Sequence, residues 1–173
     1  IQVTDLATFF EREAGKIKLG IVDPSWLVFS DGFDRRQWRQ VTKRAFDMAA
    51  STILLLLAAP LMLLTALAIW LESGFKGPII YRQERVGEGG RVFTVLKFRS
   101  MRTDAEKDGK AVWAQKDDDR ITTVGRVIRK LRIDELPQVF NVLRGDMSFV
   151  GPRPERPCFV ADLSKQIPYF GLR

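Results

Sequence analysis

The chain has 173 residues, of which 46% are hydrophobic, and its 28 Lys and Arg outnumber its 21 Asp and Glu to give a net charge of +7. It contains one Cys, Cys158, and no His, which excludes an internal disulfide bond, a histidine general base and a histidine zinc ligand. Any catalysis must therefore use carboxylates, cations or a hard metal ion. Acidic and basic side chains balance in residues 1–75, so the excess positive charge lies in residues 76–173 and predicts anionic ligands there.

Residues 1–38 are predicted to be a linker or the tail of an upstream domain that this chain lacks. A short helix is expected from Thr4, a good N-cap, to Gly15, a helix stop, and it is followed by apolar residues with turn signals. The chain begins at Ile1 without a methionine, so we expect a piece of a longer protein. No residue pattern in this part indicates chemistry.

Uncharged residues run from Met48 to Leu71 and exceed the roughly 20 that a membrane-spanning helix needs. Basic residues flank this run on both sides, at Lys43, Arg44, Lys76, Arg82 and Arg85. The positive-inside rule therefore places both ends on the cytoplasmic side, and Pro60 near the middle removes a backbone hydrogen bond of the helix. Residues 39–74 are predicted to form a helix broken at Pro60 that enters and leaves the membrane on one face. The alternatives are a kinked spanning helix and a buried helix of a soluble protein.

Two β-rich runs follow, Ile79–Gln83 and Arg91–Phe98, joined by the glycine-rich segment VGEGG. The glycines could form a phosphate loop, but no helix start or Lys-Ser/Thr pair follows, so a β-hairpin is favoured. Lys97 and Arg99 share one face of the second strand. They could hold a phosphate or simply be solvated.

Residues 104–120 are polar and rich in turn formers, which predicts a surface loop. The run Asp117-Asp118-Asp119 resembles a metal-binding cluster, but it lacks ligand spacing. It is therefore predicted to be solvated or to cap the next helix.

Two short amphipathic helices are predicted around the acidic pair Asp134-Glu135. Apolar side chains recur at helical spacing before the pair and after it, at Val124, Val127, Ile128 and Leu131 and at Leu136, Val139, Phe140 and Leu143. The second helix is expected to end at Gly145. The two acids therefore lie at the junction of the helices.

The acidic pair has two interpretations. In the first, Asp134 is a helix N-cap, Glu135 lies in the first turn, and Pro137 stands where its missing N–H costs nothing. In the second, the pair supplies a catalytic carboxylate that cations hold ionised, with or without a metal. Arg129 and Arg132 are close enough in sequence to lower the pKa of the carboxylates.

Arg153 lies between Pro152 and Pro154 in the segment GDMSFVGPRPERP. The two prolines fix the backbone, so the guanidinium would lose little entropy on binding a phosphate. The segment is either a phosphate anchor or a rigid exit loop.

Several ordered motifs together resemble one family. KRAFD precedes the apolar run, and PIIYRQERVG, KFRSMR and RIDELPQVFNVLRGDMSFVGPRPE follow it. From about Lys43 to Glu155 the chain resembles the monotopic polyprenyl-phosphate phosphoglycosyl transferases, also called bacterial sugar transferases. Upstream, DLATFFEREAGKI and PSWLVFSDGF resemble the long-form exopolysaccharide subgroup associated with exosortase systems. Ala59 departs from the family pattern, which often has Ser before the helix-breaking proline, and Thr123 stands where a basic residue is usual.

The elements and the resemblance predict an α+β, mainly helical fold. Residues 39–74 would form the re-entrant, proline-broken membrane helix. Residues 75–173 would form a small cytoplasmic α/β catalytic domain with a short β-hairpin, expected to be incomplete at its C-terminal end. The resemblance implies the cytoplasmic membrane of a bacterium, with the catalytic domain on the cytoplasmic face.

The resemblance implies that Asp134 and Glu135 form the catalytic dyad. Asp134 would attack the sugar-bearing phosphorus of a UDP-sugar, release UMP and carry a covalent sugar phosphate, which polyprenyl phosphate then accepts. Mg²⁺ is implied near the dyad, with Asp134 and Glu135 as ligands. Cations would offset the repulsion between the anionic reactants, and the candidates are Lys97, Arg99, Arg129 and Arg153.

The resemblance also implies a glucose or galactose phosphate as the transferred group, a homodimer, and no nucleic-acid partner. A different class of function remains open, in which a membrane-attached basic module binds polyanions and the acidic pair only caps a helix. Such binding would weaken gradually with salt, whereas an enzyme would lose turnover on Asp134→Asn.

Overall fold

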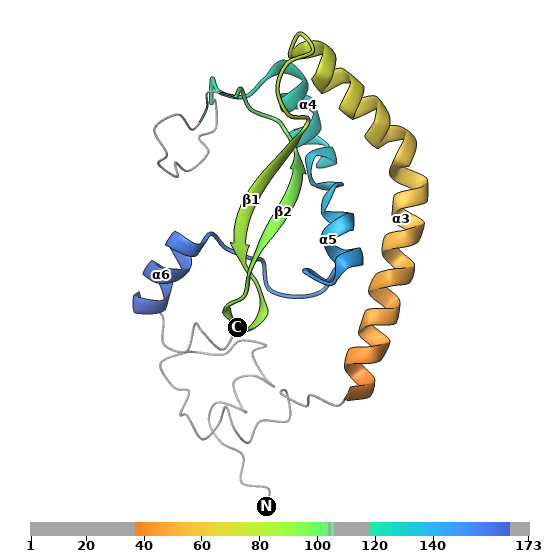
Figure 1. Ribbon diagram of the computed structural model, residues 1–173, viewed down its shortest axis with the longest axis vertical. Helices are drawn as coiled ribbons and strands as arrows, with labels where there is room; N and C mark the ends of the chain where they lie inside the picture. The colour runs from red at the N-terminus through yellow and green to blue at the C-terminus, as the bar shows by residue number, and fades with distance from the viewer. Residues whose placement is uncertain (1–36, 104, 106–117, 167–173) are drawn as a thin grey trace, which may run out of the picture. The chain divides into compact units, whose positions relative to one another are not determined.

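The computed structural model describes residues 37–103, 105 and 118–166 (Figure 1). The predicted N-terminal helix and Asp117 lie outside these residues, as does most of the predicted loop at 104–120. Contacts divide the chain into two units, Ile1–Lys43 and Arg44–Arg173. In the first unit the described residues are helical.

The long apolar helix α3 runs from Gln37 to Glu72 and contains Pro60. By length and composition it could cross a membrane. Its leucines are largely exposed, as at Leu57 with 74% of its surface accessible, which is unfavourable in water and suits a lipid environment.

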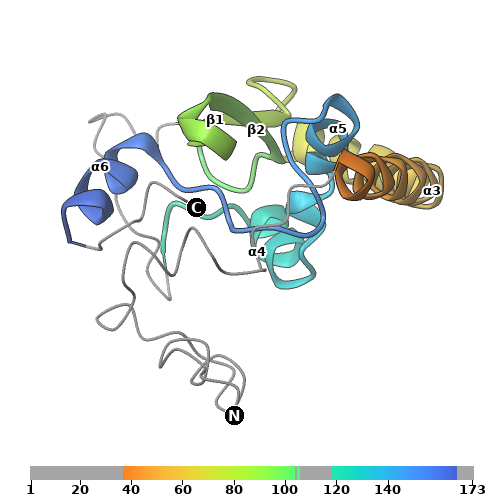
Figure 2. The same ribbon diagram turned by 90° about the horizontal axis from the view of Figure 1, so that it is seen from below.

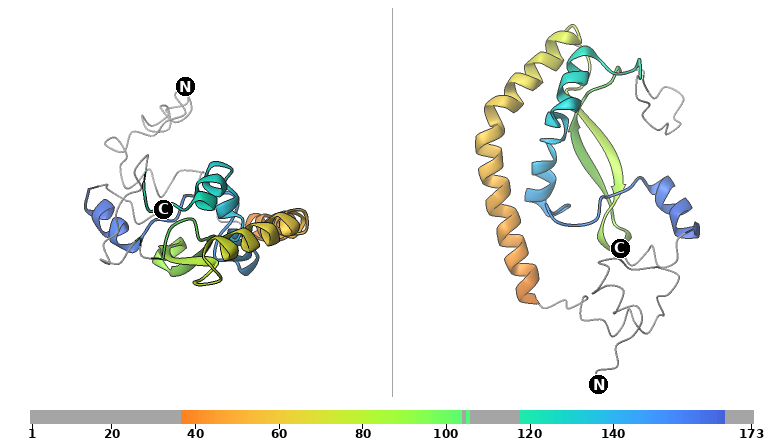
Figure 3. Two further views of the ribbon diagram at one scale, coloured as in Figure 1. Left: turned by 90° about the horizontal axis from the view of Figure 1, so that it is seen from above. Right: turned by 180° about the vertical axis from the view of Figure 1, so that it is seen from behind.

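The structure differs from the predicted break at Pro60, because α3 continues through this residue and curves instead (Figures 1 and 3). Proline removes only the bond that its own nitrogen would make, and the turns on either side can keep theirs. The hydroxyl of Thr65, one turn further on, donates to the Leu61 carbonyl at 2.8 Å. Pro60 therefore lies inside one bent helix and does not divide α3 into two.

The predicted hairpin is confirmed. Strands β1 (Ile80–Val86) and β2 (Val92–Phe98) pair antiparallel in a two-stranded sheet. A 3₁₀ turn at Glu88–Gly90 connects them, so the glycine-rich segment serves as a hairpin connection.

Helix α4 (Thr123–Lys130) begins at Thr122, whose hydroxyl oxygen accepts a hydrogen bond from the Gly125 N–H at 2.9 Å. This helix packs directly on the chain after β2, because a Cβ at Gly125 would stand 2.0 Å from the Ser100 carbonyl oxygen. Only glycine permits that approach.

Three further elements complete the described part of the chain. The 3₁₀ turn η4 covers Ile133–Glu135, helix α5 covers Gln138–Arg144 and ends at Gly145, and helix α6 covers Pro157–Gln166. Helix α5 lies between the hairpin and α3, and α6 lies on the other side of the hairpin (Figures 1 and 2).

A small core joins α3, the hairpin and α4 through Ile69, Phe98 and Ile128. The predicted apolar face of α4 is only partly buried, because Val127 and Leu131 are exposed, the latter to 62%. In α5 the buried side chains are Val139, Asn141 and Val142, while Phe140 is exposed. Both segments are helical as predicted, but the buried faces differ from the predicted apolar faces. In α4 the buried face is narrower, and in α5 it is rotated toward Asn141 and Val142 and away from Phe140. Neighbouring elements cover only one side of each helix.

Candidate active site

Asp134 and Glu135 lie on the turn η4 between α4 and α5. The chain enters this turn through Arg132, which has a left-handed backbone with φ of 60° although it is not glycine. The residue that caps α5 is Pro137, three positions after Asp134. The interpretation of Asp134 as the N-cap of that helix is therefore wrong.

The Asp134 carboxylate is half-buried, and its Oδ1 atom is buried without a hydrogen-bond partner among the described residues. Burial is the main cause that raises the pKa of Asp134, and the neighbouring charge of Glu135 raises it further. Lys97 and Arg129 act in the opposite direction, but they do not compensate. Arg129 thus lowers the pKa of Asp134 as predicted, but desolvation outweighs this effect and the net shift is upward.

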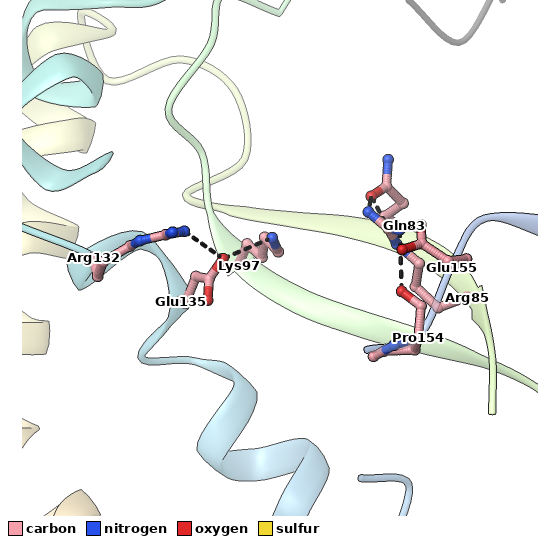
Figure 4. Close-up of polar contacts among 7 residues, drawn as sticks. All are labelled: Gln83, Arg85, Lys97, Arg132, Glu135, Pro154 and Glu155. Atoms are coloured by element: carbon pink, nitrogen blue, oxygen red, sulfur yellow. Dashed lines mark hydrogen bonds and ion pairs between the residues drawn. The ribbon is translucent and has the colours of Figure 1, made fainter. Parts of the chain in front are cut away.

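Glu135 is held by two cations from different elements (Figure 4). Its Oε1 atom lies 3.3 Å from Lys97 Nζ on β2 and 3.4 Å from Arg132 Nη1. Residues far apart in the sequence thus meet at the acidic pair, as its catalytic interpretation requires.

A pocket of about 380 Å³ opens beside Glu135, between the hairpin, α5 and the segment 147–154. Arg85, Lys97, Arg132 and Arg153 also line it, so it presents four cations around one carboxylate. Asp134 is adjacent but is not one of the lining residues. The arrangement can bind a polyanion such as a diphosphate.

The structure brings Lys97 and Arg153 together with Glu135 in this pocket, and Arg129 is close enough to act on the charge of Asp134. Arg99 is different. It lines another pocket, together with Lys76 and Arg102. The four predicted phosphate-binding cations therefore do not form one cluster.

Arg85 positions the segment that carries Arg153 (Figure 4). Its Nη1 atom donates to the Pro154 carbonyl at 3.2 Å and lies 3.4 Å from the Glu155 carboxylate, while Gln83 accepts from its Nη2 at 2.7 Å. In the sequence, Arg85 stands out only as a basic residue that follows the uncharged run. The sequence signal for its role was the alternation in RQER, which puts Gln83 and Arg85 on the same face of the strand.

Asn141 is a second positioning residue that sequence reasoning missed. It is fully buried, and its amide accepts from the Leu96 N–H at 3.0 Å and donates to the Thr94 carbonyl at 2.7 Å. These bonds fix α5 against β2. In the sequence, this role was indicated only by the position of a polar residue, Asn141, among the apolar residues of α5.

Metal ligands are few in the described part of the chain, where no group of three or more His, Cys, Asp or Glu could hold an ion. Asp118 instead pairs with Arg120 at 2.6 Å. Mg²⁺, however, is commonly held by one or two carboxylates together with substrate phosphates. The donor set of Asp134 and Glu135, with its unpartnered buried oxygen, fits such an ion.

Comparison with known proteins gives consistent matches. A family model described as Bacterial sugar transferase matches residues 38–173. A Bacillus subtilis protein whose name places it among undecaprenyl-phosphate N-acetylgalactosaminyl 1-phosphate transferases is 53% identical over 131 residues, covering 76% of this chain and 72% of that protein.

Two other relatives are longer than this chain. The UDP-N-acetylgalactosamine-undecaprenyl-phosphate N-acetylgalactosaminephosphotransferase of Aeromonas hydrophila is 53% identical over 76% of this chain and 30% of its own length. The UDP-glucose:undecaprenyl-phosphate glucose-1-phosphate transferase of Caulobacter vibrioides is 51% identical over 76% of this chain and 48% of its own length. The chain thus spans less than half of either protein. The family match, in contrast, covers residues 38–173, well over half of the chain, so the chain belongs to the bacterial sugar transferase family.

Proposed function

We propose that the chain transfers a sugar 1-phosphate from a UDP-sugar to undecaprenyl phosphate and releases UMP, as the first membrane step of exopolysaccharide biosynthesis. The names of the relatives support the reaction class. The observation that carries the proposal is the buried, unpartnered oxygen of Asp134 beside Glu135 and the cationic pocket.

The proposed reaction has two displacements at one phosphorus atom. A carboxylate oxygen of Asp134 bonds to the sugar-bearing phosphorus, and the bond to UMP breaks with its electron pair leaving on UMP. An oxygen of undecaprenyl phosphate then bonds to the same phosphorus and displaces the carboxylate, which yields the undecaprenyl diphosphate sugar. Both nucleophiles are anions, so neither step needs a histidine base.

Burial of Asp134 favours the first displacement. Its Oδ1 atom is buried without a hydrogen-bond partner, so the negative charge is less stabilised than in water, and bonding to phosphorus relieves that charge. Lys97 and Arg153 would clamp the phosphoryl oxygens in the pocket, and Arg129 would act from the side of Asp134. Mg²⁺ held by Asp134 and Glu135 would neutralise phosphate charge.

We further propose that α3 holds the chain in the bacterial cytoplasmic membrane as a re-entrant helix, with the catalytic domain on the cytoplasmic face. Its exposed apolar surface and the basic residues at both ends support this. In a Cys158→Ser background, Val41→Cys and Ser73→Cys should both react with an impermeant thiol reagent in inside-out membranes and neither in intact cells. Labelling of the two positions from opposite sides would instead indicate a spanning helix.

The reaction is tested by UMP release from the purified chain in nanodiscs with Mg²⁺, undecaprenyl phosphate and a panel of UDP-sugars. Release by the wild type and not by Asp134→Asn would support the proposal and identify the sugar. When undecaprenyl phosphate is omitted, a radiolabelled sugar phosphate should remain covalently bound to the wild type only. Labelling of Asp134→Asn would place the nucleophile elsewhere.

The named relatives use different sugars, so the panel includes UDP-glucose, UDP-galactose and UDP-N-acetylgalactosamine. The homodimer that the resemblance implies is a separate proposal. Its test is the mass of the particle in detergent. Salt-sensitive polyanion binding without any UMP release would favour the non-catalytic binding module instead.

A further inference from the structure

Arg99 carries a buried positive charge without a visible counter-ion. It follows directly after β2, where its backbone N–H donates to the Ile79 carbonyl at 2.8 Å. Only 8% of Arg99 is exposed, and its Nη1 atom is buried with no hydrogen-bond partner. Among the residues that the structure describes, Arg99 forms no ion pair. A buried guanidinium is strongly unfavourable in this state, so an anionic partner is expected.

The Arg99 side chain lines a pocket of about 460 Å³ that has the chemistry for an anion. Lys76 and Arg102 add positive charge, and the side chains of Thr103 and Thr122 are also present. Glu72 is the one acidic residue in the lining, and its Oε1 already accepts from the Val124 N–H at 3.0 Å at the start of α4. The pocket therefore keeps a positive excess.

The loop after α3 is shaped around the Arg99 guanidinium. Gly77 has φ of +83°, and a Cβ at this position would stand 2.4 Å from Arg99 Nη1. Phe75 in the same loop has φ of 65° although it is not glycine. Such strained backbone persists only where the surrounding structure fixes it, and it is often found at ligand sites.

The pocket lies at the end of α3, where an aromatic pair is exposed. The rings of Trp70 and Phe75 pack edge to face with centroids 4.6 Å apart, and both residues are exposed. Aromatic rings of this kind favour the interface between lipid and water. The phosphate groups of membrane lipids lie at the same depth.

This pocket is distinct from the one beside Glu135, because the two share no lining residue. Its lining includes Glu72 at the end of α3 and Thr122 at the start of α4, whereas the pocket beside Glu135 is lined by residues of the hairpin and α5. We propose that the Arg99 pocket binds the phosphate group of a membrane phospholipid, as an accessory site that takes no part in the transfer reaction. This inference depends on α3 lying at a membrane, but not on the chemistry of Asp134.

The test is equilibrium binding of phosphatidylglycerol to the full chain in non-ionic detergent, followed by native mass spectrometry. Lys76→Gln is the main variant, because Lys76 is exposed and its replacement should not disturb folding. Arg99→Gln is the second variant, and circular dichroism checks that it folds. Lys130→Gln is the matched control, because it removes one positive charge from an exposed site outside the pocket.

We expect Lys76→Gln and folded Arg99→Gln each to weaken phosphatidylglycerol binding at least fivefold, while Lys130→Gln stays within twofold of the wild type. A second arm replaces the lipid with inorganic phosphate. Binding of inorganic phosphate without binding of phosphatidylglycerol would contradict the proposal that the bound phosphate group belongs to a phospholipid. Equal binding by the wild type and Lys76→Gln would overturn the site itself, whatever the result of the UMP assay.

Discussion

The guanidinium of Arg44 donates a hydrogen bond to the carbonyl oxygen of Val142, with Nη1 and the oxygen 2.6 Å apart. Its Nη2 donates to the Leu143 carbonyl at the same distance. The last carbonyls of a helix have no partner inside the helix and carry partial negative charge, so Arg44 satisfies and neutralises the end of α5. One turn along α3, buried Asp47 accepts from the Phe149 N–H at 3.2 Å. Helix α3 is thereby tied to the segment that lines the pocket beside Glu135.

Arg44→Gln is expected to lower the free energy of unfolding by about 1.5–3 kcal/mol, because two charge-assisted hydrogen bonds are lost. Thermal unfolding in detergent measures the effect. Lys43→Gln changes the adjacent exposed residue by the same charge and should stay within about 0.5 kcal/mol of the wild type. Equal loss in both variants would mean that charge near the membrane, and not the contact with α5, matters.

Asp134→Asn is expected to stabilise the metal-free and substrate-free protein at neutral pH, by about 1–3 °C in melting temperature. Burial raises the pKa of Asp134 above its ordinary value of 3.8, so folding favours the protonated carboxyl. The stability that this group contributes is complete below its unfolded pKa and is lost as the pH rises through the higher folded pKa. The neutral amide avoids that loss.

The difference in melting temperature between Asp134→Asn and the wild type depends on pH for the same reason. The gain from Asp134→Asn should shrink as the pH falls toward 3.8, where the wild-type carboxyl also becomes protonated in the unfolded chain. Asp162→Asn, at an exposed position of α6, is the control and should change the melting temperature little at any pH. A lower melting temperature for Asp134→Asn at pH 7 would show that the ionised carboxylate has stabilising partners in the fold.

The sequence predicted those elements whose signal is local. Alternating residues and a glycine-rich link indicated the hairpin, and a long uncharged run indicated α3. What it did not predict depends on packing between distant segments. The pKa of Asp134 rises because η4 is partly covered, and no spacing in the sequence reports that coverage. The partners of Arg44 lie about a hundred residues away, so its role as a helix clamp was equally invisible.

Arg85→Gln and Arg153→Gln are each expected to lower kcat/KM for UMP release by about tenfold to hundredfold. Arg153 would contact the substrate, whereas Arg85 acts through Pro154 and Glu155, which it holds in place. Because both changes act on one segment, the double variant should lose less than the product of the two single losses. Strictly multiplicative losses would show that Arg85 acts independently of Arg153. A KM effect without a kcat effect would locate the role of Arg153 in substrate binding.

Gly77→Ala is expected to destabilise the fold more than Gly89→Ala, although both glycines have a left-handed backbone. The values of φ are +83° and +65°, so both variants carry the backbone cost of about 1–2 kcal/mol. A Cβ at Gly89 meets nothing within 4 Å, whereas at Gly77 it would meet Arg99 Nη1 at 2.4 Å and Thr103 Cγ2 at 3.1 Å. The difference between the two variants, measured by thermal unfolding, therefore reports the crowding around the Arg99 guanidinium. If the Arg99 side chain moves aside freely, Gly77→Ala and Gly89→Ala will lose equal stability. Phosphatidylglycerol binding by Gly77→Ala will then show whether the displaced Arg99 side chain still binds the lipid.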